Sequence, residues 1–261
     1  MTHSSVTQAA SPAGHRVRLL GVDFDTETLS QTVERVRDAA LTRRPLFLST
    51  ANVNFVVAAA RNAAFHRSLE ASDLCVPDGS PIVWFAKLVG LPLRERVAGA
   101  DVFEALRAST GTPINVYFFG GPEGAAARAG AVLNDENGGV RCVGYAYPGF
   151  GDVDSMSTDA LLEQINAARP DFVVVALGAV KGQAWIMRNR GRLSAPVVSH
   201  LGAVVNFVAG DVQRAPRWVR RIGLEWLWRI RSEPSLFTRY AKDGIRLAVL
   251  VISDLRGRLL R

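Results

Sequence analysis

Residues 46–79 read LFLSTANVNFVVAAARNAAFHRSLEASDLCVPDG, and this stretch decides the fold. It opens on an apolar run at Leu46–Ser49, continues with helix-like apolar spacing from Val53 to Leu69, and closes on a second apolar run at Leu74–Val76. Two strands joined by a helix are the unit of a parallel sheet, because the helix returns the chain to the edge where the first strand began. The stretch therefore predicts an α/β fold.

The same alternation continues on both sides of this stretch. Further strands are expected at Val17–Leu20, Ile114–Phe119, Val140–Tyr145, Phe172–Leu177 and Val197–Leu201. Helix-like spacing occurs between them, from Leu29 to Ala40 and over Asp101–Ala108, Glu123–Leu133 and Leu161–Ala168. We therefore expect a mostly parallel, Rossmann-like sheet with helices on both faces.

The composition fits one large domain with an appendage. The chain has 261 residues and is 48% hydrophobic, which is enough to build a core. We expect a flexible leader at 1–15, an α/β core at 16–210 and a basic appendage at 211–261. The leader lacks the basic start and apolar run of a signal peptide, and no stretch reaches the ~20 apolar residues of a spanning helix. These features predict a cytoplasmic protein, in which Cys75 and Cys142 are reduced core thiols.

Positive charge is concentrated at the C-terminal end. The chain has 31 Lys and Arg against 24 Asp and Glu, a net charge of +7, and residues 211–261 alone have 12 against 5. The whole excess therefore belongs to that segment. Such an asymmetry indicates a polyanionic partner, for example anionic lipid, diphosphate or nucleic acid. Nucleic acid is disfavoured, because the sequence lacks aromatic RNA-binding motifs and groove-reading modules.

Three of the five tryptophans, Trp218, Trp226 and Trp228, lie among the arginines of this segment. Cations that meet anionic headgroups, together with indole rings at the boundary, are what a surface-bound amphipathic helix needs. We therefore expect a peripheral protein on the inner face of the cell membrane, bound to an anionic surface. The alternative is a terminal helix that packs on the core and turns a solvated basic face outward.

The residues that follow each strand are the candidates for chemistry, because ligands of parallel sheets bind beyond the carboxyl ends of the strands. Asp78 follows a strand in a Pro-Asp-Gly turn, where its carboxylate could take a proton from an attacking hydroxyl, although the tripeptide is also an ordinary turn. Gly120 and Gly121 follow another strand in Gly-Gly-Pro-Glu-Gly. This loop is expected to open a helix at Pro122, whose N–H groups could bind a phosphate.

Other chemistries have less support in the sequence. The glycine loop lacks the Lys-Ser/Thr of a Walker loop and the full spacing of a dinucleotide fingerprint. Asp23 and Asp25 have the Asp-x-Asp form that holds a metal in many sugar-nucleotide enzymes, but Asp25 or Thr26 is expected to cap the first helix instead. The four histidines show no ligand spacing. We therefore expect neither a metal nor a cofactor.

Read in order, the loops resemble the WecG/TagA/CpsF family of glycosyltransferases, from about Leu19 to Tyr240. The fragments that carry the resemblance are STANVNFV, PDGSPIVW, RVAGADVF, FFGGPEGAA, YPGF, VALGAVKGQAW, VAGDVQRAPRW and GLEWLWRIRSEP. Their joint order and spacing is more specific than any one of them.

The resemblance implies an inverting, metal-independent, β-linkage-forming hexosyltransferase. It would move a sugar from a UDP-sugar to a sugar on an undecaprenyl-type diphosphate, in the synthesis of bacterial exopolysaccharide or another cell-surface polysaccharide. Asp78 becomes the base by position. The implied substrate contacts and phosphate donors are Thr50, Asn52, Arg96, Gly120, Gly121 and Lys181, and the implied lipid-diphosphate contacts are Arg229 and Arg239.

Three departures from the family pattern concern specificity. Val180–Gln183 stands where the family typically has Pro-Lys-Gln-Glu, so Gln183 is the candidate to replace the missing glutamine. Val205–Asn206 stands where the family has Phe-Asp, and Leu236 where it has a further arginine. These departures leave the transferred sugar open, and they motivate the alternative of a non-catalytic relative that binds UDP-sugar and membrane. The oligomeric state, including a homo-oligomer, is also left open.

Overall fold

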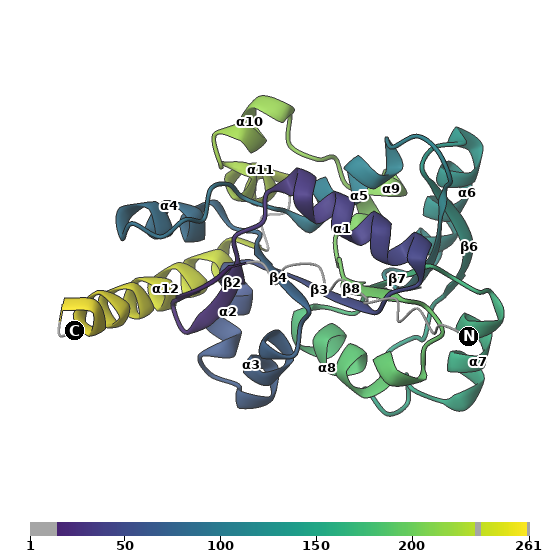
Figure 1. Ribbon diagram of the computed structural model, residues 1–261, viewed down its shortest axis with the longest axis horizontal. Coiled ribbons are helices and arrows are strands. Elements are labelled where there is room, and N and C mark those ends of the chain that lie inside the picture. The colour runs from purple at the N-terminus through teal and green to yellow at the C-terminus, as the bar shows by residue number, and fades with distance from the viewer. Residues whose placement is uncertain (1–14, 233–235, 260–261) are drawn as a thin grey trace, which may run out of the picture.

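A computed structural model of the chain describes residues 15–232 and 236–259, so the expected leader lies outside the described residues except for its last position. The core is a six-stranded parallel sheet in the order β4-β3-β8-β7-β5-β6 (Figure 1). The strands are β3 (Leu46–Ala51), β4 (Leu74–Pro77), β5 (Ile114–Gly120), β6 (Val140–Ala146), β7 (Phe172–Ala176) and β8 (Val197–His200). Each coincides with a predicted strand, and the parallel sheet is confirmed.

Helices cover both faces of this sheet, as predicted (Figure 1). One face packs against α1 (Leu29–Thr42), α5 (Gly99–Arg107), α6 (Ala125–Glu136) and α9 (Val204–Val208). The other packs against α7 (Asp159–Ala167) and α8 (Ala179–Asn189). Successive side chains of a strand point to opposite faces, so a strand covered on both sides must be apolar throughout, as the fully buried run FVVVA of β7 is.

A third cluster lies beside the β3–β4 end of the sheet. It contains α2 (Val53–Ala59), α3 (Ala63–Glu70) and α4 (Ser80–Leu88), together with an antiparallel hairpin of β1 (Arg16–Leu19) and β2 (Val22–Asp25). The predicted strand Val17–Leu20 therefore exists but does not join the main sheet. Leu20 and Gly21 both have positive φ, which is the geometry of a tight two-residue hairpin turn.

Two local predictions at helix starts are wrong. Thr28, rather than Asp25 or Thr26, caps α1, and Asp25 lies buried at the end of β2, where it accepts from Cys75 N–H at 2.7 Å and pairs with Arg16. The single helix expected from Val53 to Leu69 is two helices, because Asn62 Oδ1 accepts from the N–H of Phe65 and starts α3 afresh.

The C-terminal segment forms α10 (Arg217–Arg221), α11 (Glu225–Ser232) and α12 (Leu236–Leu259). The last of these packs along α2, where Asn54 Nδ2 donates to Asp243 Oδ2 at 3.0 Å and Leu247 and Leu250 join the apolar cluster. Over the ranges 15–232 and 236–259, none of the helices is long and apolar enough to cross a membrane.

Candidate functional site

Asp78 lies where β4 leaves the sheet. Its backbone N–H donates to Ala51 O at 3.0 Å, and its Oδ2 accepts from the N–H of Gly99, the first residue of α5, at 3.4 Å. A Cβ on Gly99 would lie 2.5 Å from Leu201 Cδ2 and 2.9 Å from Thr50 Oγ1, so only glycine lets α5 begin this close to the strand ends. The structure therefore brings Asp78 and Thr50 together around the start of α5.

Arg96 reaches the same point from the loop between α4 and α5. Its Nη1 lies 4.0 Å from Asp78 Oδ1 and 2.8 Å from Glu225 Oε2, and its Nη2 lies 2.7 Å from Asp101 Oδ2. The Arg96 side chain is only 16% exposed. One guanidinium thus faces three carboxylates and connects Asp78 to α11.

This environment perturbs Asp78. Burial raises the pKa of Asp78 from 3.8 to about 7. The Arg96 guanidinium opposes that rise in pKa, the Glu225 carboxylate adds to it, and the Gly99 N–H and Asp101 have smaller effects of opposite sign. The Asp78 side chain is still 22% exposed, so a substrate hydroxyl can reach it. A carboxyl whose pKa lies near neutrality is well matched to accept a proton in catalysis.

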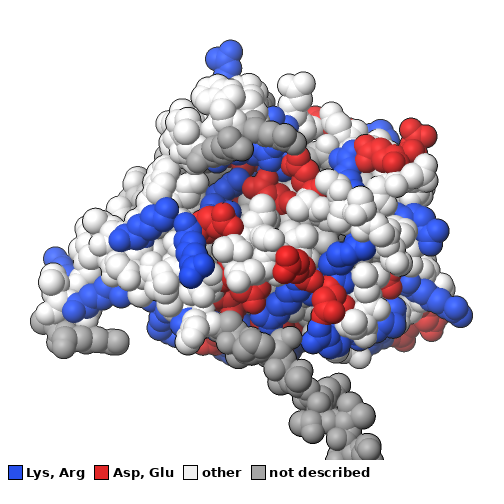
Figure 2. Space-filling model, turned by 45° about the horizontal axis from the view of Figure 1, so that its top comes forward, with Lys and Arg blue, Asp and Glu red and all other residues white. Residues whose placement is uncertain are grey.

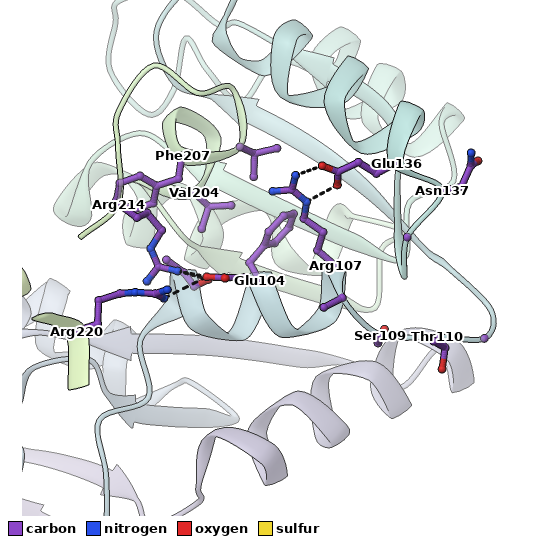
Figure 3. A pocket seen from close by; sticks show the side chains of 16 residues that line it. Glu104, Arg107, Ser109, Thr110, Glu136, Asn137, Val204, Phe207, Arg214 and Arg220 are labelled. Carbon is purple, nitrogen blue, oxygen red and sulfur yellow. Dashed lines mark hydrogen bonds and ion pairs between the residues drawn. The ribbon is translucent and has the colours of Figure 1, made fainter. Parts of the chain in front are cut away.

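Behind Arg96, the arginines of the C-terminal segment are held by acids of α5. Arg214 and Arg220 each lie 2.7 Å from Asp101 Oδ1, and both also pair with Glu104 (Figure 3). Figure 2 shows acidic and basic side chains next to one another on one face of the molecule. Arg214 and Arg220, which contribute to the positive charge of residues 211–261, therefore join that segment to the core and do not face an external anion.

Two further predicted contacts lie at the end of β3. Thr50 is 5% exposed and packs under Gly99. Asn52 is half-buried, and its Oδ1 accepts from Phe55 N–H at 3.2 Å, which caps α2. Asn52 therefore shapes the start of α2, while Thr50 lies against Gly99, whose N–H binds the Asp78 carboxylate.

The glycine loop has a structural role at the end of β5. Gly120 and Gly121 have positive φ, and the N–H of Gly121 donates to Ala176 O at 2.8 Å, so this group is engaged within the sheet. A Cβ on Gly120 would lie 2.8 Å from the same carbonyl oxygen. The helix begins at Ala125, three residues after Pro122, because Pro122–Gly124 forms a turn. The glycines thus let β5 approach β7 closely.

The α8 residues point in different directions. Lys181 Nζ donates to Gly151 O at 2.6 Å, across the loop that follows β6. Gln183 is 1% exposed, and its Nε2 donates to Ser49 Oγ at 2.9 Å inside the core. Because Ser49 and Thr50 are consecutive on β3, they face opposite sides of the sheet. Gln183 therefore does not lie with Thr50 and Asp78, which corrects the expectation that it takes over a substrate contact.

His200 is a further polar residue at the carboxyl edge of the sheet, and no sequence pattern indicated it. It ends β8 at the centre of the carboxyl edge and is 8% exposed, and burial lowers the pKa of its imidazole to about 4. A Cβ on Gly182 would lie 2.2 Å from His200 Cδ2. The glycine at position 182, where the chain departs from the family pattern, is therefore what makes room for a neutral imidazole.

The two predicted lipid-diphosphate contacts lie on different helices. Arg229 is half-buried on α11, one turn after Glu225, which itself binds Arg96. Arg239 is exposed in the first turn of α12, and its guanidinium lies 5.4 Å from the ring centre of Tyr240. Arg229 therefore lies on the same helix as the carboxylate that binds Arg96.

Neither of two cavities in the described part of the chain is lined by Asp78. The larger, of about 810 Å³, lies on the outer side of α5 between α6, α9 and Arg214 (Figure 3). Its wall includes the pairs Arg107–Glu136 and Arg214–Glu104. The smaller, of about 270 Å³, lies at the carboxyl end of β6 and is lined by Tyr145 and Tyr147. Within the described residues, no group of three or more His, Cys, Asp or Glu could hold a metal ion.

Comparison with known proteins decides the family. The model of the glycosyl transferase WecG/TagA/CpsF family matches residues 17–260. The chain belongs to this family. An N-acetylglucosaminyldiphosphoundecaprenol N-acetyl-β-D-mannosaminyltransferase of Bacillus spizizenii is 28% identical over 84% of each chain. A protein of the same name from Staphylococcus aureus is 26% identical over 82% of this chain and 84% of its own.

Among solved structures, unliganded arylmalonate decarboxylase covers 81% of this chain with 82% of its own, at 17% identity and a TM-score of 0.25. A TM-score this low supports no statement about the site.

As a WecG/TagA/CpsF glycosyltransferase, the chain has its most strongly perturbed carboxyl among the described residues, Asp78, at the strand ends. The sequence analysis missed Gly99, Asp101 and Glu225 around it. Glu225 had a detectable signal, since it is the only acid among the arginines of residues 214–232.

Proposed function

We propose that this chain is an inverting hexosyltransferase that moves a sugar from a UDP-sugar to a sugar carried on a polyprenyl diphosphate, in the synthesis of a bacterial exopolysaccharide or another cell-surface polysaccharide. The observation that carries the proposal is Asp78, a strand-end carboxyl with a pKa near 7 in a glycosyltransferase of this family. The names of the relatives support the substrate class, because they specify an acceptor linked to diphosphoundecaprenol and a sugar as the group transferred.

The chemistry is a direct displacement at the anomeric carbon. The Asp78 carboxylate takes the proton of an acceptor hydroxyl, the hydroxyl oxygen forms the new bond to the anomeric carbon, and the bond to the UDP oxygen breaks with inversion. A β-linkage then forms from an α-linked donor. We propose that the reaction needs no metal, so protein groups must stabilise the charge on the leaving diphosphate.

The proposed contacts follow from where the side chains lie. Arg96 holds the base in position and balances its charge, since it already binds Asp101 and Glu225. Lys181, in the first turn of α8, is a half-buried cation that can turn from Gly151 O toward a diphosphate. Thr50, Asn52 and the Gly120–Gly121 turn shape the donor pocket, and Arg229 and Arg239 bind the diphosphate of the lipid.

The C-terminal segment 211–261 is proposed to hold the protein on the inner face of the cell membrane. Its net charge of +7 and its three tryptophans support this assignment, even though Arg214 and Arg220 are occupied by internal pairs. Of these tryptophans, Trp218 is 65% exposed and Trp226 is 39% exposed. Interfacial side chains of this kind are accessible to a lipid surface.

The test is the Asp78→Asn variant, assayed with a panel of UDP-sugars against GlcNAc- and Glc-diphosphate lipids. The wild type should transfer at least one sugar, and the variant should lose transfer by a factor of about 10² or more while it keeps its fold and its affinity for the donor. Normal turnover in Asp78→Asn would exclude Asp78 as the base.

A non-catalytic relative is the second candidate, favoured by the loss of a side chain at Gly182 and by Asn206 in place of an acid. Under this alternative the wild type binds a UDP-sugar with a measurable heat in calorimetry but consumes none of it. The same donor panel therefore separates the two candidates.

A further inference from the structure

Helix α4 exposes large apolar side chains although it belongs to the core. Trp84 is 51% exposed and Leu88 is 76% exposed, and they lie four residues apart on one side of the helix. The opposite side, with Ile82 and Phe85, packs into the apolar cluster. Trp84 and Leu88 are therefore not needed for the packing of α4 on the core.

A second exposed apolar stripe lies on α12. Ile245, Val249 and Ile252 are 69%, 62% and 51% exposed and follow the spacing of one helix face. The other face of α12 packs through Leu247 and Leu250 into the same cluster as α4. Both helices project from the same end of the molecule (Figure 1).

The turn between α10 and α11 connects these helices to the rest of the C-terminal segment. A Cβ on Gly223 would lie 2.6 Å from Ser80 Oγ and 2.8 Å from Trp84 Cζ2, so this turn is in direct contact with α4. Trp218 and Ile222, which precede it, are 65% and 51% exposed. Apolar surface thus continues from α4 to α10.

The exposed charged side chains near the apolar surface of α4 and α12 are mostly cations. Lys87 on α4 and Lys242 and Arg256 on α12 are exposed. The acids of α12 are engaged, since Asp243 is buried against Asn54 and Asp254 pairs with Arg258. At the end of the molecule where α12 lies, Figure 2 shows blue side chains projecting from a largely white surface. Apolar side chains ringed by cations complement an anionic lipid bilayer.

We propose that α4 is a bilayer-inserting element of the core, and that Trp84 and Leu88 enter an anionic membrane alongside the exposed face of α12. The inference deepens the proposed function, on which it rests, by connecting the base directly to a helix that enters the lipid. Asp78 lies two residues before the start of α4, so a helix of nine residues separates the base from the inserted end. At 1.5 Å per residue this helix is about 14 Å long.

The experiment uses the full chain and vesicles of phosphatidylglycerol and phosphatidylcholine, without sugar substrates. The variant Trp84→Ala/Leu88→Ala should partition about 10- to 100-fold more weakly than the wild type, because two large apolar side chains no longer leave water. The control Leu41→Ala/Met187→Ala removes exposed apolar side chains on α1 and α8 and should partition as the wild type does. Circular dichroism checks that both variants fold.

A second measurement reports insertion directly. An environment-sensitive fluorophore on Leu88→Cys should shift to the blue with anionic vesicles, whereas the same label on Leu41→Cys should not; the native Cys75 and Cys142 are buried. Unchanged partitioning of the α4 double variant, or a label at position 88 that stays in water, overturns the inference. A wild type that inserts but transfers no sugar contradicts the proposed function alone.

Discussion

The isosteric change Asp78→Asn should make the protein more stable as well as inactive. The pKa of Asp78 is about 7 in the folded protein and 3.8 for an ordinary aspartate, so the folded state binds the proton more tightly than the unfolded chain does. Because the folded pKa is raised, the stabilising effect is complete below about pH 4 and is lost as the pH rises through 7. Above pH 7, the ionised carboxyl destabilises the fold relative to a neutral group of the same shape.

The size of the effect follows from the two pKa values. Each pKa unit corresponds to ~1.4 kcal/mol, so the ionised carboxyl costs up to about 4 kcal/mol at pH 8 and about 2 kcal/mol at pH 5. Asp78→Asn removes this cost and leaves Arg96 bound to Asp101 and Glu225. The variant should therefore gain stability at pH 8 and lose about half of that gain by pH 5.

The assay is urea unfolding of the wild type and the variant at pH 5, 6, 7 and 8, followed by circular dichroism. Asp38→Asn is the matched control. Asp38 is an aspartate on α1 whose side chain is about half exposed, and it also pairs with an arginine, Arg44. It should show no gain that grows with pH. A variant Asp78→Asn that is less stable than the wild type at pH 8, or a gain that does not depend on pH, would refute the reasoning that burial raises the pKa of this carboxyl.

Two further predictions concern the surroundings of the base. Glu225→Gln should move the rising limb of the kcat/KM profile to lower pH by about 0.5 to 1.5 units, because Glu225 raises the pKa of Asp78. The two carboxylates share one guanidinium and lie within ~7 Å of each other. A limb that stays in place or moves to higher pH contradicts this electrostatic explanation. Gly182→Ala should destabilise the fold by about 1–3 kcal/mol in thermal unfolding, because its Cβ would lie 2.2 Å from His200 Cδ2. Adding His200→Ala should recover most of the lost stability. Equal losses in the single and the double variant contradict the steric explanation.

The sequence by itself predicted the core strands of the fold and the place of the candidate base. The six core strands are apolar because they are buried on both faces, and this local property is visible in short runs such as FVVVA. The rule that ligands bind beyond the carboxyl ends of parallel strands made Asp78 one of several candidates, and the family resemblance assigned the role of base to it.

Only the tertiary structure decided which groups surround Asp78 and how they change its chemistry. Arg96 and Glu225 are 129 residues apart in the chain yet bind each other at 2.8 Å, and no local pattern encodes such a contact. Strand register decided that Gln183 turns into the core toward Ser49, because neighbouring residues of a strand face opposite sides. The pKa of a carboxyl depends on burial and on nearby charges, both of which arise only when distant segments pack together.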